Sequence, residues 1–265
     1  MSTEKTIKAQ SKRYLCGNWV TIISAILALC TVGILIETMF WIITIYFKII
    51  NVETGTVYDS RSLAYVLVLL STVFVVLLLS PLINGIYKMI GNLVRGKPCE
   101  ISDMCYFFGN IRRYLKTVII NMVLIILFMF FSKLTNVFEY TCYLLNADYY
   151  RDFGLNFTTL ILFFAGAVTV VINILLYLII LNYPLIAYSF DDSKSAVKYI
   201  FGYLGVSFRN FGKTIKLVWS FIGLLLLCFF VAPAFYVVPY LLTSLANSAK
   251  WLFEIENKKY IGSGF

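Results

Sequence analysis

One carboxylate, Glu37, stands inside the apolar stretch ALCTVGILIETMFWIITIYF, which covers residues 28–47. A charged side chain in a membrane span raises the free energy of insertion, and such residues usually face the interior of a helix bundle. The default hypothesis for Glu37 is therefore a functional one, as a ligand contact. Aromatic residues typical of a membrane interface follow it, so we expect Glu37 in the outer leaflet. The alternative is structural, with Glu37 protonated or hydrogen-bonded to Asn, Thr or a backbone carbonyl.

Polar amides recur in the other apolar runs. We predict Asn84, Asn121 and Asn173 as further intramembrane residues that line a cavity or contact a ligand together with Glu37. The alternative is that these side chains hydrogen-bond between neighbouring helices, as Asn and Ser commonly do in lipid.

Several residue patterns that are typical of enzyme active sites are absent from the sequence. The chain contains no histidine, so histidine catalysis and histidine metal ligation are excluded. No Walker loop, G-x-S-x-G or H-E-x-x-H motif is present. Asp191 and Asp192 form an adjacent acid pair, and their place before an amphipathic segment is typical of helix capping. We therefore predict no catalytic residue, no metal and no cofactor, and a protein that is not an enzyme.

The composition indicates an integral membrane protein. Of 265 residues, 61% are hydrophobic and only 13% are charged, whereas soluble domains have about 45–50% apolar and about 25% charged residues. The surplus apolar surface must face lipid. Because the apolar runs are continuous rather than alternating, they predict helices and not a barrel. The expected fold class is all-α, a polytopic transmembrane helix bundle that forms one membrane domain over residues 1–265.

We expect about six spans, with five as the alternative, since about 20 apolar residues are needed to cross a bilayer. The last apolar run is too long for one crossing, and Pro233 and Pro239 divide it. The third span continues past the membrane edge, and we expect this extension to pack against the first helix as a small outer cap. The predicted spans cover residues 19–50, 63–90, 117–146, 157–190, 215–231 and 234–252.

Two amphipathic segments, 101–116 and 193–206, separate these spans. Their helical apolar stripes predict interfacial helices that lie in the headgroup plane on the inner side. Lys and Arg gather in the N-terminal arm and in these segments, which places the N-terminus in the cytoplasm. The net charge of +9 is then explained by anionic headgroups and needs no nucleic acid. The residues expected to contact headgroups or a partner are Arg112, Arg113, Lys116 and Arg209.

Four short motifs occur in order along the chain: Leu15, Gly17 and Trp19, then Gly85, Arg95 and Gly96, then Ser220, Phe221, Ile222 and Gly223, and finally Pro239 and Tyr240. With these motifs the chain resembles a family of bacterial polytopic membrane proteins catalogued as "domain of unknown function 975". Leu224 departs from the tryptophan usual in that family, and the outer segment Lys133–Asn156 is longer than usual. The resemblance implies a multi-pass protein of the bacterial plasma membrane and no known activity.

Three functional hypotheses remain open at this stage. The leading one is a non-enzymatic membrane component that handles or senses a hydrophobic or peptide ligand. The second is a permease subunit of an ABC-type exporter, in which segment 103–116 or 193–203 docks on a separate cytoplasmic ATPase. The third is a structural or immunity-type protein whose outer cap binds another membrane protein. The lipid bilayer is a partner in all three, and the sequence leaves the oligomeric state open.

Overall fold

The computed structural model describes residues 3–46, 61–144, 157–228 and 232–262. These ranges are helical and contain no strand, so the all-α prediction is confirmed. The elements are α1 (Thr3–Leu15), α2 (Trp19–Tyr46), α3 (Arg61–Val94), the 3-10 helix η1 (Ile101–Gly109), α4 (Ile111–Leu134), α5 (Val137–Leu144), α6 (Phe157–Tyr177), the π-helix η3 (Leu178–Asn182), α7 (Tyr183–Phe190), the π-helix η4 (Lys198–Gly202), α8 (Tyr203–Arg209), α9 (Phe211–Trp219), α10 (Ile222–Leu227) and α11 (Ala234–Gly262).

Among the described residues, four segments are long and apolar enough to cross a membrane. The predicted spans 215–231 and 234–252 are not among them. The first is divided into α9 and α10 by a turn and reaches residues outside the described part. The second lies in α11, which has the length but carries buried polar residues along one side. The four segments are Trp19–Ile43, Val73–Val94, Ile111–Leu144 and Thr159–Phe190.

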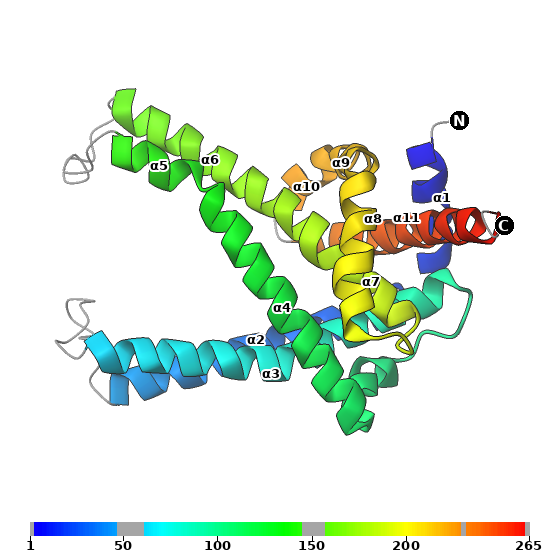
Figure 1. Cartoon of the computed structure of the whole chain (residues 1–265), viewed down its shortest axis with the longest axis horizontal. Coiled ribbons are helices and arrows are strands. Elements are labelled where there is room, and N and C mark those ends of the chain that lie inside the picture. Colours follow the sequence, from blue (N-terminus) through cyan, green and yellow to red (C-terminus); the bar gives the residue numbers. More distant parts are fainter. Residues whose placement is uncertain (1–2, 47–60, 145–156, 229–231, 263–265) are drawn as a thin grey trace.

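Two helical arms extend in the same general direction in Figure 1, and the chain termini lie at the opposite end. Helices α2 and α3 form one arm, in which the rings of Phe40 and Phe74 meet edge to face with their centroids 5.9 Å apart. Helices α5 and α6 form the other arm, and α4 packs against helices of both. We call the opposite end, where α1 and α11 lie, the terminal end.

The expected outer cap is different in the structure. Helix α4 ends at Leu134, and the Asn136 side chain accepts a hydrogen bond from the Glu139 amide at 3.2 Å, which starts α5 in a new direction. Helix α5 then packs on α6, where Thr169 accepts a hydrogen bond from the Phe138 amide at 2.8 Å. In its described part, up to Leu144, the extension therefore packs against the following helix and not against the first one, and the rest of the predicted cap lies outside the described residues.

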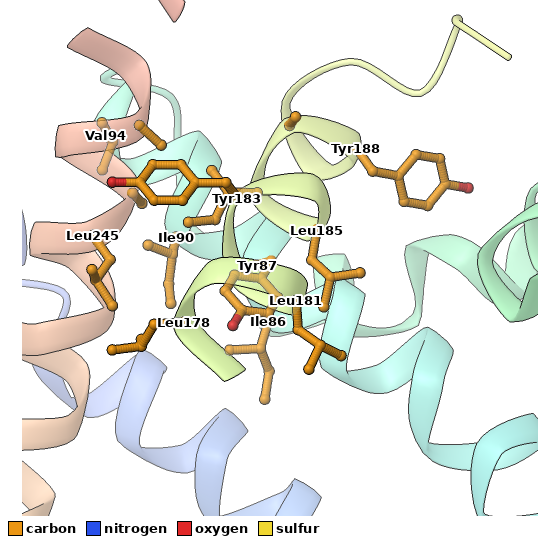
Figure 2. Packing of buried hydrophobic residues seen from close by; sticks show 14 of the residues in the cluster. Ile86, Tyr87, Ile90, Val94, Leu178, Leu181, Tyr183, Leu185, Tyr188 and Leu245 are labelled. Carbon is orange, nitrogen blue, oxygen red and sulfur yellow. The ribbon is translucent and has the colours of Figure 1, made fainter. Parts of the chain in front are cut away.

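The main hydrophobic core lies at the terminal end. Figure 2 shows apolar side chains from α3, η3, α7 and α11 gathered there, including Ile90 of α3, Leu178 of η3 and Leu245 of α11. Tyr188 points away from this group and stacks on Phe107 of η1, with ring centroids 5.1 Å apart. The core thus joins the ends of three predicted spans to a short helix that the sequence analysis assigned to the headgroup plane.

The first predicted interfacial helix, 101–116, is divided in the structure. The 3-10 helix η1 ends at Gly109, Asn110 is extended, and its side chain caps α4 by accepting a hydrogen bond from the Arg112 amide at 2.9 Å. Met104 and Phe107 of the predicted stripe are buried in the bundle. They reach the core because Gly85 of α3 has no side chain where the Met104 backbone crosses it.

The second predicted interfacial helix, 193–206, corresponds to η4 and the first part of α8. Ile200 of the predicted stripe is buried in the protein together with the neighbouring Tyr199 and Val206, whereas Val197 and Phe201 of the stripe are exposed. The stripe is therefore shared between the protein core and the surface.

Pro81 interrupts the hydrogen-bond ladder of α3 and is compensated by α4. Proline has no amide hydrogen, so the carbonyl four residues earlier, that of Leu77, loses its partner within the helix. The Tyr114 hydroxyl donates to this carbonyl at 3.2 Å. This contact fixes α4 against the middle of α3, next to the arm that contains Glu37.

Candidate functional site

A hollow of about 510 Å³ lies between α2 and α3 and contains Glu37 in its wall. We call it the α2–α3 groove. The α3 residues follow one another at four-residue spacing, and the α2 residues likewise share one helix face. The groove is lined by Gly33, Glu37, Phe40 and Trp41 of α2 and by Ser71, Val75 and Leu79 of α3.

Small residues open the groove. A Cβ atom added at Gly33 would meet nothing within 4 Å, so this part of the α2 wall is empty space. Ser71 is the small residue of the α3 wall. At 1.5 Å per residue, Glu37 is about 9 Å along the helix from the end of the apolar segment at Ile43. The groove therefore lies along the side of the arm, inside the segment that is apolar enough to cross a membrane.

The chemistry of the groove is that of binding. Its seven lining residues include one carboxylate, one hydroxyl and two aromatic rings, and the others are apolar or glycine. In the part of the chain that the structure describes, no group of three or more His, Cys, Asp or Glu residues is placed to hold a metal ion. The arrangement fits a mostly apolar molecule with one polar group directed at Glu37.

The three asparagines predicted as ligand contacts do not line this groove with Glu37. Asn121 is buried and donates to the Thr117 carbonyl at 2.9 Å, within its own helix. Asn173 accepts a hydrogen bond from Ser132, which joins α6 to α4. Asn173 thus makes a hydrogen bond between helices, as in the alternative interpretation, whereas Asn121 makes its hydrogen bond within α4.

Asn84 differs, because it is fully buried and neither atom of its amide has a hydrogen-bond partner within the described ranges. It belongs to a polar stripe on α3 with Ser80 and Tyr87, at spacings of four and three residues. The Tyr87 hydroxyl donates to Asn182 of η3 at 3.2 Å. The buried Ser80 hydroxyl and the Asn182 amide nitrogen have no partner in the same ranges.

This polar stripe was not recognised as one feature in the sequence, although its members are polar residues in apolar runs. Its signal was the spacing of Ser80, Asn84 and Tyr87, which places them on one helix face. The contribution of Asn182 depends on η3 lying against α3, which only the tertiary structure shows.

Arg113 and Lys116, which were predicted to meet headgroups or a partner, bind the protein itself. The Arg113 guanidinium forms an ion pair with Asp192 at 3.1 Å. The Lys116 ammonium donates to the Asp192 carbonyl at 2.5 Å. Arg112 and Arg209 are exposed. The charged cluster therefore holds the loop after α7 against α4.

The same loop is fixed from α3 and η1. Arg95 donates to the Phe190 carbonyl at 2.6 Å, which satisfies a carbonyl at the C-terminus of α7, where a cation is favourable. The Tyr106 hydroxyl donates to Asp192 at 3.2 Å, and the Lys88 ammonium lies 4.6 Å from the centre of the Tyr106 ring. Burial raises the pKa of Tyr106.

The acid pair has a structural role in this arrangement. Asp191 accepts a hydrogen bond from the Ser193 amide at 3.0 Å. Hydrogen bonds from Ser193 hold the pKa of the Asp191 carboxyl below its usual range. With Asp192 bound to Arg113 and Tyr106, both carboxylates serve to shape the loop.

Comparison with known proteins does not identify the chain: no family model, no curated protein and no solved structure matches it.

Proposed function

We propose that this chain is a non-enzymatic integral membrane protein that binds a hydrophobic ligand in the α2–α3 groove and handles or senses it there. The observation that carries the proposal is the position of Glu37, a single carboxylate in the wall of a mostly apolar hollow whose other aliphatic polar side chain is that of Ser71. An acid at this place raises the free energy of insertion, so a binding role accounts for its presence. The volume of about 510 Å³ is in the range of small-molecule sites, about 300–1,000 Å³.

The proposal includes a topology in the bacterial plasma membrane. The terminal end faces the cytoplasm, because Lys and Arg gather in the segments that lie there. Helix α2 then runs outward, which puts Glu37 in the outer leaflet. The crossings at 215–231 and 234–252 complete six spans in this proposal, and the resemblance to the family of unknown function belongs to it as well.

Impermeant thiol labelling in whole cells tests the topology. In a background without the six native cysteines, a cysteine at Tyr143 should react from outside, and one at Lys258 only after the cells are opened. Labelling of Lys258→Cys in intact cells would contradict six spans.

Mass spectrometry of retained small molecules tests the groove. Gly33→Leu should fill the open wall, since a Cβ at this position meets nothing within 4 Å. Wild-type chain purified in a mild detergent should retain hydrophobic molecules that Gly33→Leu loses. The matched control is Gly223→Leu in α10, which is also in open space and should retain them. Equal retention by all three proteins would contradict ligand binding in the groove.

A further inference from the structure

No basic side chain lines the α2–α3 groove in the part of the chain that the structure describes. Among these described lining residues Glu37 is the charged one, and α2 contains no Lys or Arg between Trp19 and Tyr46. A carboxylate removed from bulk water is costly unless an opposite charge or hydrogen-bond donors accompany it. A ligand that brings a positive charge would supply the missing partner.

Two aromatic rings stand beside this carboxylate. Phe40 and Trp41 follow Glu37 by three and four residues, so all three lie on the same helix face and line the same hollow. The faces of aromatic rings attract cations, Trp most strongly, and the attraction grows when water is excluded. A carboxylate with adjacent aromatic rings is therefore a recognition site for an organic cation.

The rest of the groove selects against small hydrated ions. Gly33, Val75 and Leu79 continue it by one to two helical turns toward the terminal end and offer no hydrogen-bonding side chain. Divalent metal ions need several oxygen ligands, whereas the groove has one carboxylate and one hydroxyl. A cation whose charge is shielded by alkyl or aryl groups can occupy this space without losing a strong hydration shell.

We propose that the α2–α3 groove binds a lipophilic monovalent cation, with its charge at Glu37 and its apolar body along Gly33, Val75 and Leu79. The ring faces of Phe40 and Trp41 complete the site around the charge. This inference rests on the proposed function, because it takes the groove to be the ligand site and specifies the chemistry of the ligand.

Tetraphenylphosphonium and tetraphenylborate are suitable probes, because they have nearly the same size and shape and opposite charges. Binding of each radiolabelled ion is measured with the full chain in nanodiscs of neutral phosphatidylcholine, after subtraction of binding to empty nanodiscs. Wild-type chain should bind tetraphenylphosphonium saturably and tetraphenylborate not at all. Glu37→Gln should weaken tetraphenylphosphonium binding by roughly tenfold or more, whereas Glu37→Asp, which keeps the charge, should weaken it by less.

The matched control for loss of charge is Glu139→Gln. Glu139 is exposed on α5 and paired with Lys133 at 2.8 Å, away from the groove, so this variant should bind the cation like wild type. The thermal unfolding of Glu37→Gln is measured in parallel. If Glu37→Gln does not fold, binding by Glu37→Asp and Trp41→Leu decides instead, and Trp41→Leu should weaken binding by a few-fold.

Three results would overturn the inference: no saturable cation binding by wild type, equal binding of both ions, or unchanged cation binding by Glu37→Gln. Failure of the proposed function has a different signature, namely retention of native hydrophobic molecules by Gly33→Leu. If Gly33→Leu loses those molecules while Glu37→Gln binds the cation normally, the groove is a ligand site and its ligand is not a cation.

Discussion

Gly85 provides the sharpest test of the packing at the terminal end. A Cβ atom at this position would lie 2.0 Å from the Met104 carbonyl oxygen and 2.6 Å from the Met104 carbonyl carbon. Ordinary van der Waals contact begins at 3.4 Å, so the oxygen has to move by 3.4 − 2.0 = 1.4 Å. The obstacle is backbone and cannot rotate away, so η1 has to shift as a whole from its seat on α3.

The cost of Gly85→Ala follows from two opposing effects. Overpacking of a well-packed core typically lowers the free energy of unfolding by about 1–3 kcal/mol. A forced backbone shift that loosens Met104 and Phe107 should lie at the upper end of this range, at about 3 kcal/mol. The higher helix propensity of alanine returns about 1 kcal/mol. The net loss is about 2 kcal/mol, which corresponds to a melting temperature roughly 4–8 °C lower for a chain of this size.

The assay is thermal unfolding of purified variants in one detergent, followed by circular dichroism. Gly33→Ala is the matched control, because it makes the same change within a helix where the added Cβ meets nothing within 4 Å. This control should melt slightly above wild type, by roughly 2–4 °C. A Gly85→Ala variant that melts at or above wild type would refute the close approach of η1 to α3.

Three further predictions concern hydrogen bonds. Asn84→Leu should raise stability by about 1–3 kcal/mol in the same unfolding assay, since it removes a buried amide without a partner in the described ranges; a lower melting temperature would contradict this. Tyr114→Phe should cost about 1 kcal/mol, because it removes the donor to the carbonyl that Pro81 leaves unpaired, and an unchanged melting temperature would show that contact to be unimportant. Hydrogen bonds from Ser193 lower the pKa of Asp191, so its stabilising contribution is complete above the unfolded-state pKa of about 4 and is lost as the pH falls through the lower folded-state pKa. Wild type and Asp191→Ala should therefore differ in melting temperature at pH 7, and this difference should shrink as the pH falls through the lowered folded-state pKa of Asp191; a constant difference would contradict the linkage.

The helical class could be predicted from the sequence because it depends on composition and local pattern. Continuous apolar runs can satisfy their backbone groups in lipid only as helices or closed barrels. The structure places helices over all of the predicted spans that it describes. The apolar run after Ile215 was harder to interpret, because Pro233 and the turn at Ser220 divide it into short pieces. Hydropathy does not decide whether such short pieces cross a membrane.

The segment 101–116 shows that a sequence pattern does not predict what a helix face packs against. Its apolar stripe predicts that one helix face is removed from water. That face can be buried equally well at the lipid headgroup boundary or in the protein core. Gly85 lies in another helix, and the space that it leaves allows η1 to enter the core. Arg113 and Lys116 were likewise expected at headgroups, whereas the structure places them on the loop at Asp192.

The sequence by itself determined that the chain is helical, and that one acid, Glu37, stands within a segment that is long and apolar enough to cross a membrane. These are properties of single residues and of neighbours along the chain. Only the tertiary structure decided that Glu37 faces Ser71 and Val75 across a hollow, and that Asn84 is buried without a hydrogen-bond partner in the described ranges while Asn121 bonds its own helix. Such outcomes depend on which distant segments meet, and lipid-facing and protein-facing positions have nearly the same hydropathy, so the pattern alone does not separate them.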